Sequence, residues 1–292
     1  MSVNRKQLIG ILQISLGSLG FGFLGIFGKL AFNSGLSVGA LLTYRFLIAA
    51  ALLWIVLFLF KRERIRLSFD QIIISAGLGV LGYAVFATLY FTAIQGMSVG
   101  LAALLLYTYP FWVSFLSHFF LKERMSSLQW LLLLGAFIGV ACLLWGRFHL
   151  SHMASLLAGL GSALTYAGYI LFSARYQRSV QPISSSLYVI TFAGIALALY
   201  HQPPLAMWRV LSLHQWQIVL GIATLSTILP VTMILAGLQK LRSSQAALTS
   251  MLEPVTAAIA AGILFHETMT ALQVVGATIV ITCLTLSALR KA

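Results

Sequence analysis

Apolar stretches of about twenty residues follow one another along almost the whole chain, and each is long enough to cross a bilayer as a helix. Lipid offers the backbone no hydrogen-bond partners, so a chain that spans it forms helices or a closed barrel. A barrel would show alternating polarity in segments of about ten residues. The continuous apolar runs therefore predict an all-α integral membrane protein.

The scarcity of charge agrees with this prediction. Only 8% of the residues are charged, whereas a soluble domain carries about 25%. We expect ten transmembrane helices, at residues 8–32, 36–60, 71–95, 99–121, 127–145, 154–174, 184–201, 214–238, 244–265 and 271–289. The net charge of +13 lies mostly in the short loops between them, so we interpret it as a topology signal and expect no nucleic-acid partner.

Lysine and arginine gather in alternate loops. One set of loops carries Arg5, Lys6, Lys61, Arg62, Arg64, Arg66, Lys122, Arg124, Arg175, Arg178, Lys240, Arg242, Arg290 and Lys291. The other set carries Arg147 and Arg209. Because cytoplasmic loops are the ones enriched in these residues, we expect a multi-pass protein of the bacterial inner (plasma) membrane with both termini in the cytoplasm.

The second half of the sequence resembles the first at a constant offset, defined by the match of Tyr44 with Tyr188. The same offset pairs scarce residues elsewhere: Gln71 with Gln215, Gln95 with Gln239, Pro110 with Pro254, Glu123 with Glu267 and Gln129 with Gln273. We expect residues 1–147 to form one five-helix repeat and residues 151–292 another. Since five is odd, the second repeat would be inverted in the membrane, which is typical of secondary transporters with a central cavity.

Two segments resemble a known family. They are Leu252-Glu253-Pro254 with the apolar stretch to His266-Glu267-Thr268, and the arginine-bearing segment Tyr44-Arg45-Phe46-Leu47-Ile48-Ala49. Both are similar to segments of the ten-helix drug/metabolite transporter superfamily, the first to its second EamA-type half. Over the whole chain, the resemblance implies a basket-like fold and export of small metabolites, often amino acids. The first half departs from the pattern, with Tyr109 where the second has Glu253.

Small and polar residues line one face of the first span. Ser18 and Gly22 belong to this stripe, and their repeat mates are Ser162 and Tyr166, with Tyr169 one turn further. Polar side chains avoid lipid, so the stripes face either a water-filled cavity or a closely packed neighbouring helix. We include Ser18, Gly22, Tyr166 and Tyr169 among the candidate substrate-binding residues.

Two prolines interrupt spans at matching depth. Pro110 and Pro254 each remove a backbone hydrogen bond near the middle of a span, which indicates a binding region, a bending gate or a structural kink. Tyr107 and Trp112 lie beside Pro110; the Trp112 ring would either stack on a substrate or pack.

Two charged residues within spans complete the candidate site. Glu253 would bind a substrate amine, carry a coupling proton, or form a structural ion pair. Arg45 would bind a substrate carboxylate or extend to the interface. Glu123 and Glu267 end spans 4 and 9, where we expect a loop or capping role.

A secondary transporter is the function these features favour. We expect export of amino acids, with a weak preference for aromatic or hydrophobic ones; import of a vitamin or nucleoside-like compound is the alternative. An intramembrane enzyme is disfavoured, because His266-Glu267 lacks the second histidine of a His-Glu-x-x-His zinc motif. We expect no cofactor and no metal, a small-molecule substrate, contact with membrane lipids, protons as a candidate coupling ion, and a monomer or homodimer.

Overall fold

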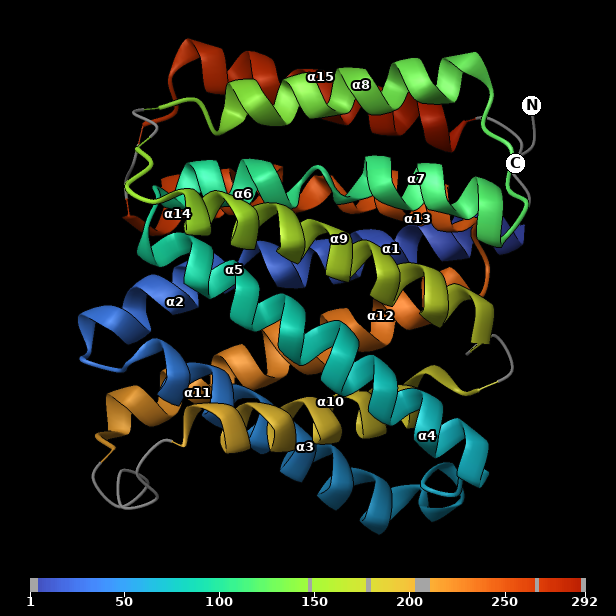
Figure 1. Cartoon of the computed structure of the whole chain (residues 1–292), viewed down its shortest axis with the longest axis vertical. Helices are drawn as coiled ribbons and strands as arrows, with labels where there is room; N and C mark the ends of the chain where they lie inside the picture. Colours follow the sequence, from blue (N-terminus) through green and yellow to red (C-terminus); the bar gives the residue numbers. More distant parts are fainter. Residues whose placement is uncertain (1–4, 147–148, 177–179, 203–210, 266–267, 290–292) are drawn as a thin grey trace.

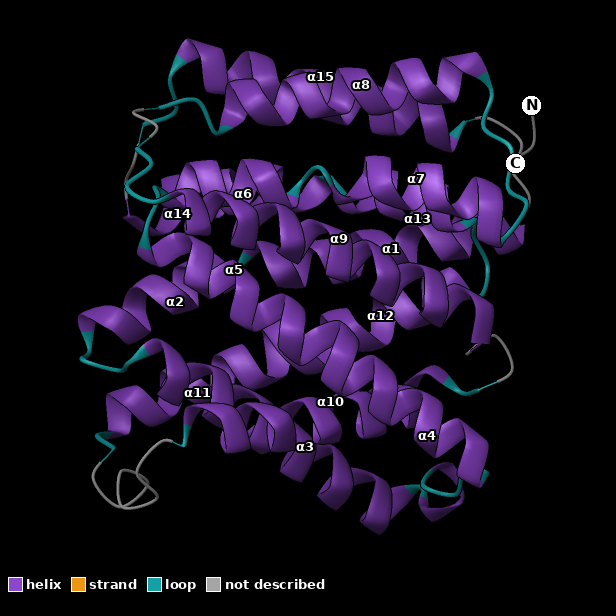
Figure 2. Cartoon of the chain, viewed as in Figure 1, coloured by secondary structure: helices purple, strands orange, loops and turns teal. Residues whose placement is uncertain are grey.

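The chain folds into helices joined by short loops (Figures 1 and 2). The computed structural model describes residues 5–146, 149–176, 180–202, 211–265 and 268–289, and within these ranges it contains no β-strand. Nine helical stretches within the described residues are long and apolar enough to cross a membrane, five of them made of consecutive helical elements, and Ser127–Leu143 is a shorter apolar helix. The predicted all-α membrane fold is confirmed.

The helix bounds follow the predicted spans closely. The elements are α1 (Arg5–Gly22), α2 (Leu24–Asn33), α3 (Val38–Phe60), η1 (Arg62–Arg64), α4 (Phe69–Gly77), η2 (Leu78–Ala84), α5 (Val85–Gln95), α6 (Val99–Leu106), α7 (Tyr109–Phe120), α8 (Ser127–Leu143), α9 (Met153–Tyr176), α10 (Pro182–His201), α11 (Leu213–Ala223), η4 (Thr224–Ile228), α12 (Leu229–Leu238), α13 (Ser243–Ser250), α14 (Leu252–Phe265) and α15 (Ala271–Ala288). Several residues named above lie outside the described ranges: Arg147, Arg178, Arg209, His266, Glu267, Arg290 and Lys291.

Two of the three matched pairs of glutamines have a structural role at helix starts. Gln71 and Gln215 each close a capping box, with Ser68 and Ser212 as the N-cap residues. Gln129 and Gln273 do the same for α8 and α15. A capping box satisfies backbone N–H groups that the first turn of a helix leaves free. These two matched pairs therefore mark where corresponding helices begin.

The interruptions of the spans also recur in both halves. The fourth span is broken between α6 and α7, and the ninth between α13 and α14. The helices before these breaks end at Leu106 and Ser250, which are related by the repeat offset. The two π-helical segments, η2 and η4, lie in corresponding spans as well. Such π-helical turns occur frequently at functional sites.

Helices from both halves pack against one another in the middle of the bundle. α1 packs on α12 and α14, and α9 packs on α5 and α7. α8 and α15 form a separate pair along one edge (Figure 1). They touch at Gly139 and Gly276, where a Cβ on either glycine would lie within 2.8 Å of the other's carbonyl oxygen. This close approach requires the absence of side chains at both positions.

Candidate functional site

Glu253 lies where the ninth span is interrupted. The break ends α13 at Ser250, so Glu253 occupies the first turn of α14. Free backbone N–H groups and the helix dipole favour a negative charge in a first turn. A side-chain hydrogen bond from the Tyr107 hydroxyl reaches the Glu253 carboxylate. Tyr107 follows α6 directly, so this hydrogen bond connects the break in the fourth span with the break in the ninth.

Tyrosine rings surround this carboxylate. The Tyr166 ring packs edge-on against Tyr109, with 4.8 Å between ring centroids, and lies 4.7 Å from Phe86. The Tyr83 ring lies 5.3 Å from Tyr169. We call the carboxylate with these rings the central cluster; it comprises Glu253, Tyr83, Phe86, Tyr90, Tyr107, Tyr109, Tyr166 and Tyr169. The charge of Glu253 interacts electrostatically with the hydroxyls of Tyr83, Tyr90, Tyr107, Tyr109 and Tyr166.

Arg45 is buried beside the central cluster and does not extend to the membrane interface. Its side chain is 3% exposed. Arg45 Nε donates a hydrogen bond of 2.6 Å to Thr227 Oγ1, and Nη2 donates one of 2.9 Å to the carbonyl oxygen of Ser226. It also hydrogen-bonds Tyr83 and lies over the Phe46 ring, 4.9 Å from its centroid. Arg45 thus braces the π-helical segment η4 of the second half.

The stripe of small and polar residues on the first span packs closely against neighbouring helices, whereas the matching stripe on α9 contributes to the central cluster. Ser18 is fully buried, and its hydroxyl donates to the Ile14 carbonyl one turn earlier. A Cβ on Gly22 would lie 2.6 Å from the Cβ of Thr256, so α1 and α14 are in direct contact there. Close helix packing therefore accounts for Ser18 and Gly22. On α9, the counterpart of Gly22 is Tyr166, which belongs to the central cluster together with Tyr169 one turn further.

The prolines follow the helix breaks. Pro110 is the second residue of α7 and Pro254 the third residue of α14. A proline in the first turn costs no hydrogen bond, because the N–H there has no partner within the helix. Trp112 is 39% exposed on the outside of α7, so the structure does not bring it into the central cluster.

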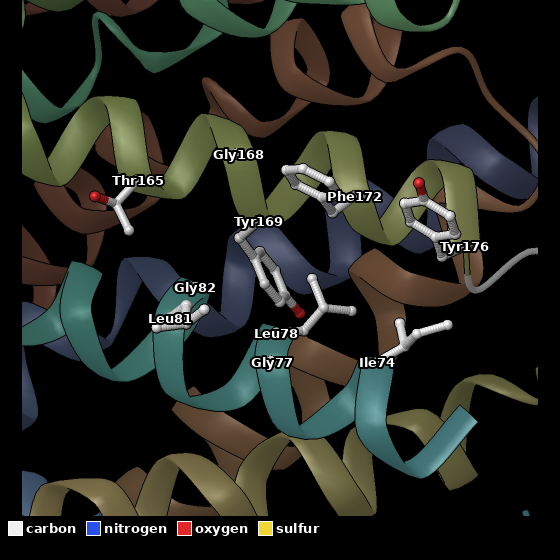
Figure 3. Close-up of a pocket in the computed structure, with 10 residues that line it drawn as sticks. All are labelled: Ile74, Gly77, Leu78, Leu81, Gly82, Thr165, Gly168, Tyr169, Phe172 and Tyr176. Carbon is white, nitrogen blue, oxygen red and sulfur yellow. The ribbon is translucent and has the colours of Figure 1, made fainter. Parts of the chain in front are cut away.

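An apolar groove approaches the central cluster from the side. It encloses about 410 Å³ between α4–η2 and α9 (Figure 3). Its lining consists of Ile74, Gly77, Leu78, Leu81, Gly82, Thr165, Gly168, Tyr169, Phe172 and Tyr176. The Tyr169 side chain extends from α9 toward Leu78 in this view. Because Tyr169 also packs on Tyr83 and Tyr166, it lies between the groove and the rest of the central cluster.

A bundle of membrane-spanning helices around a buried polar cluster defines a polytopic membrane transporter. Within the described residues, no group of three or more His, Cys, Asp or Glu side chains could hold a metal ion. The family model described as "EamA-like transporter family" matches residues 8–145 and again 153–289. The chain belongs to the EamA-like transporter family, whose members are transporters and not enzymes.

Several known proteins are similar to the chain over most of their length. "Uncharacterized transporter YcbK" of Bacillus subtilis is 25% identical over 93% of this chain and 90% of its own. "Threonine/homoserine exporter RhtA" of Escherichia coli K12 is 26% identical over 73% of this chain and 70% of its own. A solved crystal structure has the same fold, with a TM-score of 0.80 at 18% identity, over 98% of this chain and 96% of its own.

Sequence reasoning missed part of the central cluster and one link between the halves. Tyr83, Phe86 and Tyr90 carry no pattern that separates them from aromatic residues that simply pack. Tyr109 had one signal, since it is the repeat mate of Glu253. The predicted capping role of Glu123 is confirmed, but its carboxylate caps α13 in the other half rather than the next helix.

Proposed function

We propose that the protein exports small amine-bearing metabolites, amino acids foremost, through the inner membrane by alternating access. The observation that carries the proposal is the central cluster, in which the Glu253 carboxylate lies between the helix breaks of the two halves and faces tyrosine side chains from α7 and α9. A carboxylate in this position suits the ammonium group of a substrate, and the rings suit an apolar side chain.

Two inverted halves would provide the two conformations that alternating access needs. Three observations support this arrangement. Corresponding helices carry matching capping boxes, the spans are broken at matching positions, and α1 and α9 run in opposite directions (Figure 1). The broken helices place backbone polar groups at the depth of Glu253, as secondary transporters do at their binding sites.

The positions of lysine and arginine residues indicate how the bundle is oriented in the membrane. Lys61, Lys122 and Arg175 lie in loops or helix ends at one end of the bundle, and α1 begins at the same end (Figure 1). We assign this end to the cytoplasm by the positive-inside rule. Substrate would then enter from this side and leave on the other, while an amine and a proton compete for Glu253.

The preference among amino acids comes from the walls of the site. The similar Escherichia coli protein is named as an exporter of threonine and homoserine, which supports amino acids as the class. The ring centroids of Phe86 and Tyr109 lie 4.7 and 4.8 Å from that of Tyr166. A side chain that stacks between such rings gains about 0.5–1.5 kcal/mol beyond its buried area. We therefore expect aromatic and hydrophobic amino acids to be moved faster than small polar ones.

Transport by purified protein in lipid vesicles tests the proposal. Vesicles loaded with unlabelled amino acid are diluted into labelled amino acid, with and without a pH gradient, and counterflow is measured for a panel of side chains. We expect counterflow of phenylalanine and leucine that disappears in Glu253→Gln. The matched control is Glu63→Gln, which removes an exposed carboxylate in η1. Absence of counterflow for every amino acid would refute the proposal, and unchanged transport and pH dependence in Glu253→Gln would refute the role of that carboxylate.

A further inference from the structure

We propose that the site recognises the amine of its substrate alone, so that organic amines lacking a carboxylate are bound and transported as well as amino acids. This inference rests on the proposed function and specifies its substrate class. An amino acid offers a transporter both an ammonium and a carboxylate. Glu253 supplies a partner for the ammonium, and the question is whether a cation in the site is free for the carboxylate.

Arg45 is the cation nearest to the central cluster, and it already has partners. Its Nε binds Thr227 Oγ1 and its Nη2 binds the Ser226 carbonyl oxygen, at 2.6 and 2.9 Å. Tyr83 accepts a further hydrogen bond. The Ser226 hydroxyl in turn donates to the Gly20 carbonyl, 2.8 Å away, so these groups hold η4 against α1. Three of the five guanidinium N–H groups are therefore engaged, and a two-pronged contact with a substrate carboxylate would compete with this network.

Lys29 is placed differently from a substrate-binding cation. It is exposed on α2, and its Nζ lies over the Phe265 ring, 4.2 Å from the centroid. Phe265 is the last residue of α14, whereas Glu253 lies in the first turn of the same helix. With a rise of about 1.5 Å per residue, the two ends of α14 are roughly 18 Å apart. An amino acid bound at Glu253 does not reach Lys29.

The remaining walls of the central cluster favour cations. The faces of tyrosine and phenylalanine rings attract an ammonium group within about 6 Å. Phe86, Tyr109 and Tyr166 present such rings, and Glu253 adds a negative charge in its ionised form. A substrate carboxylate placed among these groups would be repelled by the ionised Glu253 carboxylate, and the nearest cation, Arg45, is already bonded to η4. The site therefore requires the amine and tolerates the carboxylate.

Competition with matched compounds tests the inference. Counterflow of labelled phenylalanine is measured against phenethylamine and phenylalanine methyl ester, which lack the carboxylate, and against N-acetylphenylalanine, which lacks the ammonium. We expect the first two to compete within about threefold of phenylalanine and the third at least roughly tenfold more weakly. Labelled phenethylamine should itself show counterflow, which Glu253→Gln abolishes. Strong competition by N-acetylphenylalanine, or none by phenethylamine, would overturn the inference.

A variant of Arg45 tests whether this residue contacts the substrate carboxylate or acts only by holding η4. In Arg45→Gln, a lost carboxylate contact would weaken the binding of phenylalanine and leave that of phenethylamine unchanged. We expect the ratio of the two apparent affinities to stay the same, because Arg45 acts through η4. If the ratio shifts about tenfold against phenylalanine, Arg45 binds the carboxylate and the inference is wrong.

The failure of the inference can be told from the failure of the proposed function. If phenylalanine is transported and phenethylamine neither competes nor is transported, amino-acid export stands and the inference alone fails. If no amino acid is transported, the inference is tested by the thermal unfolding of the purified protein. A rise of the melting temperature with phenethylamine, absent in Glu253→Gln and absent with N-acetylphenylalanine, would support it. No rise with phenethylamine would contradict it.

Discussion

Glu123 links the two halves at the cation-rich end of the bundle, and its removal should open that end. Its side chain is 9% exposed. Oε1 accepts the N–H of Ser243 at 3.0 Å, and Oε2 accepts the N–H and the hydroxyl of Ser244 at 3.3 and 3.2 Å. Ser243 begins α13, so the carboxylate also faces the positive end of a helix dipole.

The change Glu123→Gln weakens this link without altering its shape. The glutamine amide carries no charge, and its NH₂ group replaces one of the two accepting oxygens. This NH₂ group would face the N–H of Ser243 or of Ser244, which is also a donor. Hydrogen bonds to a charged group contribute about 1.5–3 kcal/mol and those between neutral groups about 1 kcal/mol. The change removes one hydrogen bond and the charge that faces the dipole of α13. We therefore expect the conformation in which residue 123 contacts α13 to be destabilised by about 2 kcal/mol, which is roughly a 30-fold change in its population relative to a conformation in which this contact is open.

Cysteine labelling measures this opening. Ala247 is 1% exposed on α13, and its carbonyl oxygen accepts a hydrogen bond from Tyr109 at 3.5 Å. We expect a cysteine at this position, in a chain without Cys142 and Cys283, to react with a membrane-impermeant maleimide from the cytoplasmic side roughly tenfold or more faster when Glu123 is glutamine. The control is Arg124→Gln, which removes an exposed neighbouring charge. Equal labelling rates in the two variants would refute the reasoning.

Three further changes test the packing around the site. Arg45→Gln should lower the free energy of unfolding in detergent by about 2–4 kcal/mol, through the lost hydrogen bonds to η4, whereas the exposed Arg62→Gln should not; equal melting temperatures would contradict this. Gly22→Leu should separate α1 from α14 and lower the melting temperature by several degrees, whereas Gly25→Leu, with no atom within 4 Å of its Cβ, should leave it unchanged. Gly168 also has open space around it, so Gly168→Phe should fill the groove between α4–η2 and α9 and slow counterflow without changing the melting temperature. The control, Leu157→Phe at an exposed position, should leave counterflow unchanged. Normal turnover in Gly168→Phe would show that the groove does not close during transport.

Regular features of the chain were predictable wherever the membrane imposed them. The spans followed from apolar length because a helix must cross a fixed thickness of hydrocarbon. The repeat offset predicted matched interruptions, and the helix bounds show them at Leu106 and Ser250. Within the site, Tyr107, Tyr166, Tyr169 and Glu253 were predicted and lie together, since each combined polarity with a position in the middle of a span.

Other parts of the site depended on contacts that no sequence pattern encodes. Trp112 and Tyr109 are three residues apart, and only the packing of α7 turns one outward and the other toward Tyr166. Arg45 looked like a free cation because its partners, Ser226 and Thr227, lie some 180 residues further along the chain. The close approach of Thr256 to Gly22, which shows that α1 packs there against α14, is likewise not encoded in the sequence of α1.

The sequence by itself determined the membrane environment, the approximate limits of the spans, and the matching depth of the interruptions in the fourth and ninth spans. These depend on local hydrophobicity, capping residues and proline, which act within a few residues of themselves. The tertiary structure alone decided which polar groups are bonded to one another across the bundle. That choice depends on distances between helices far apart in the chain, and it distinguishes Arg45, which is tied to η4, from Glu253, which faces the rings of the central cluster.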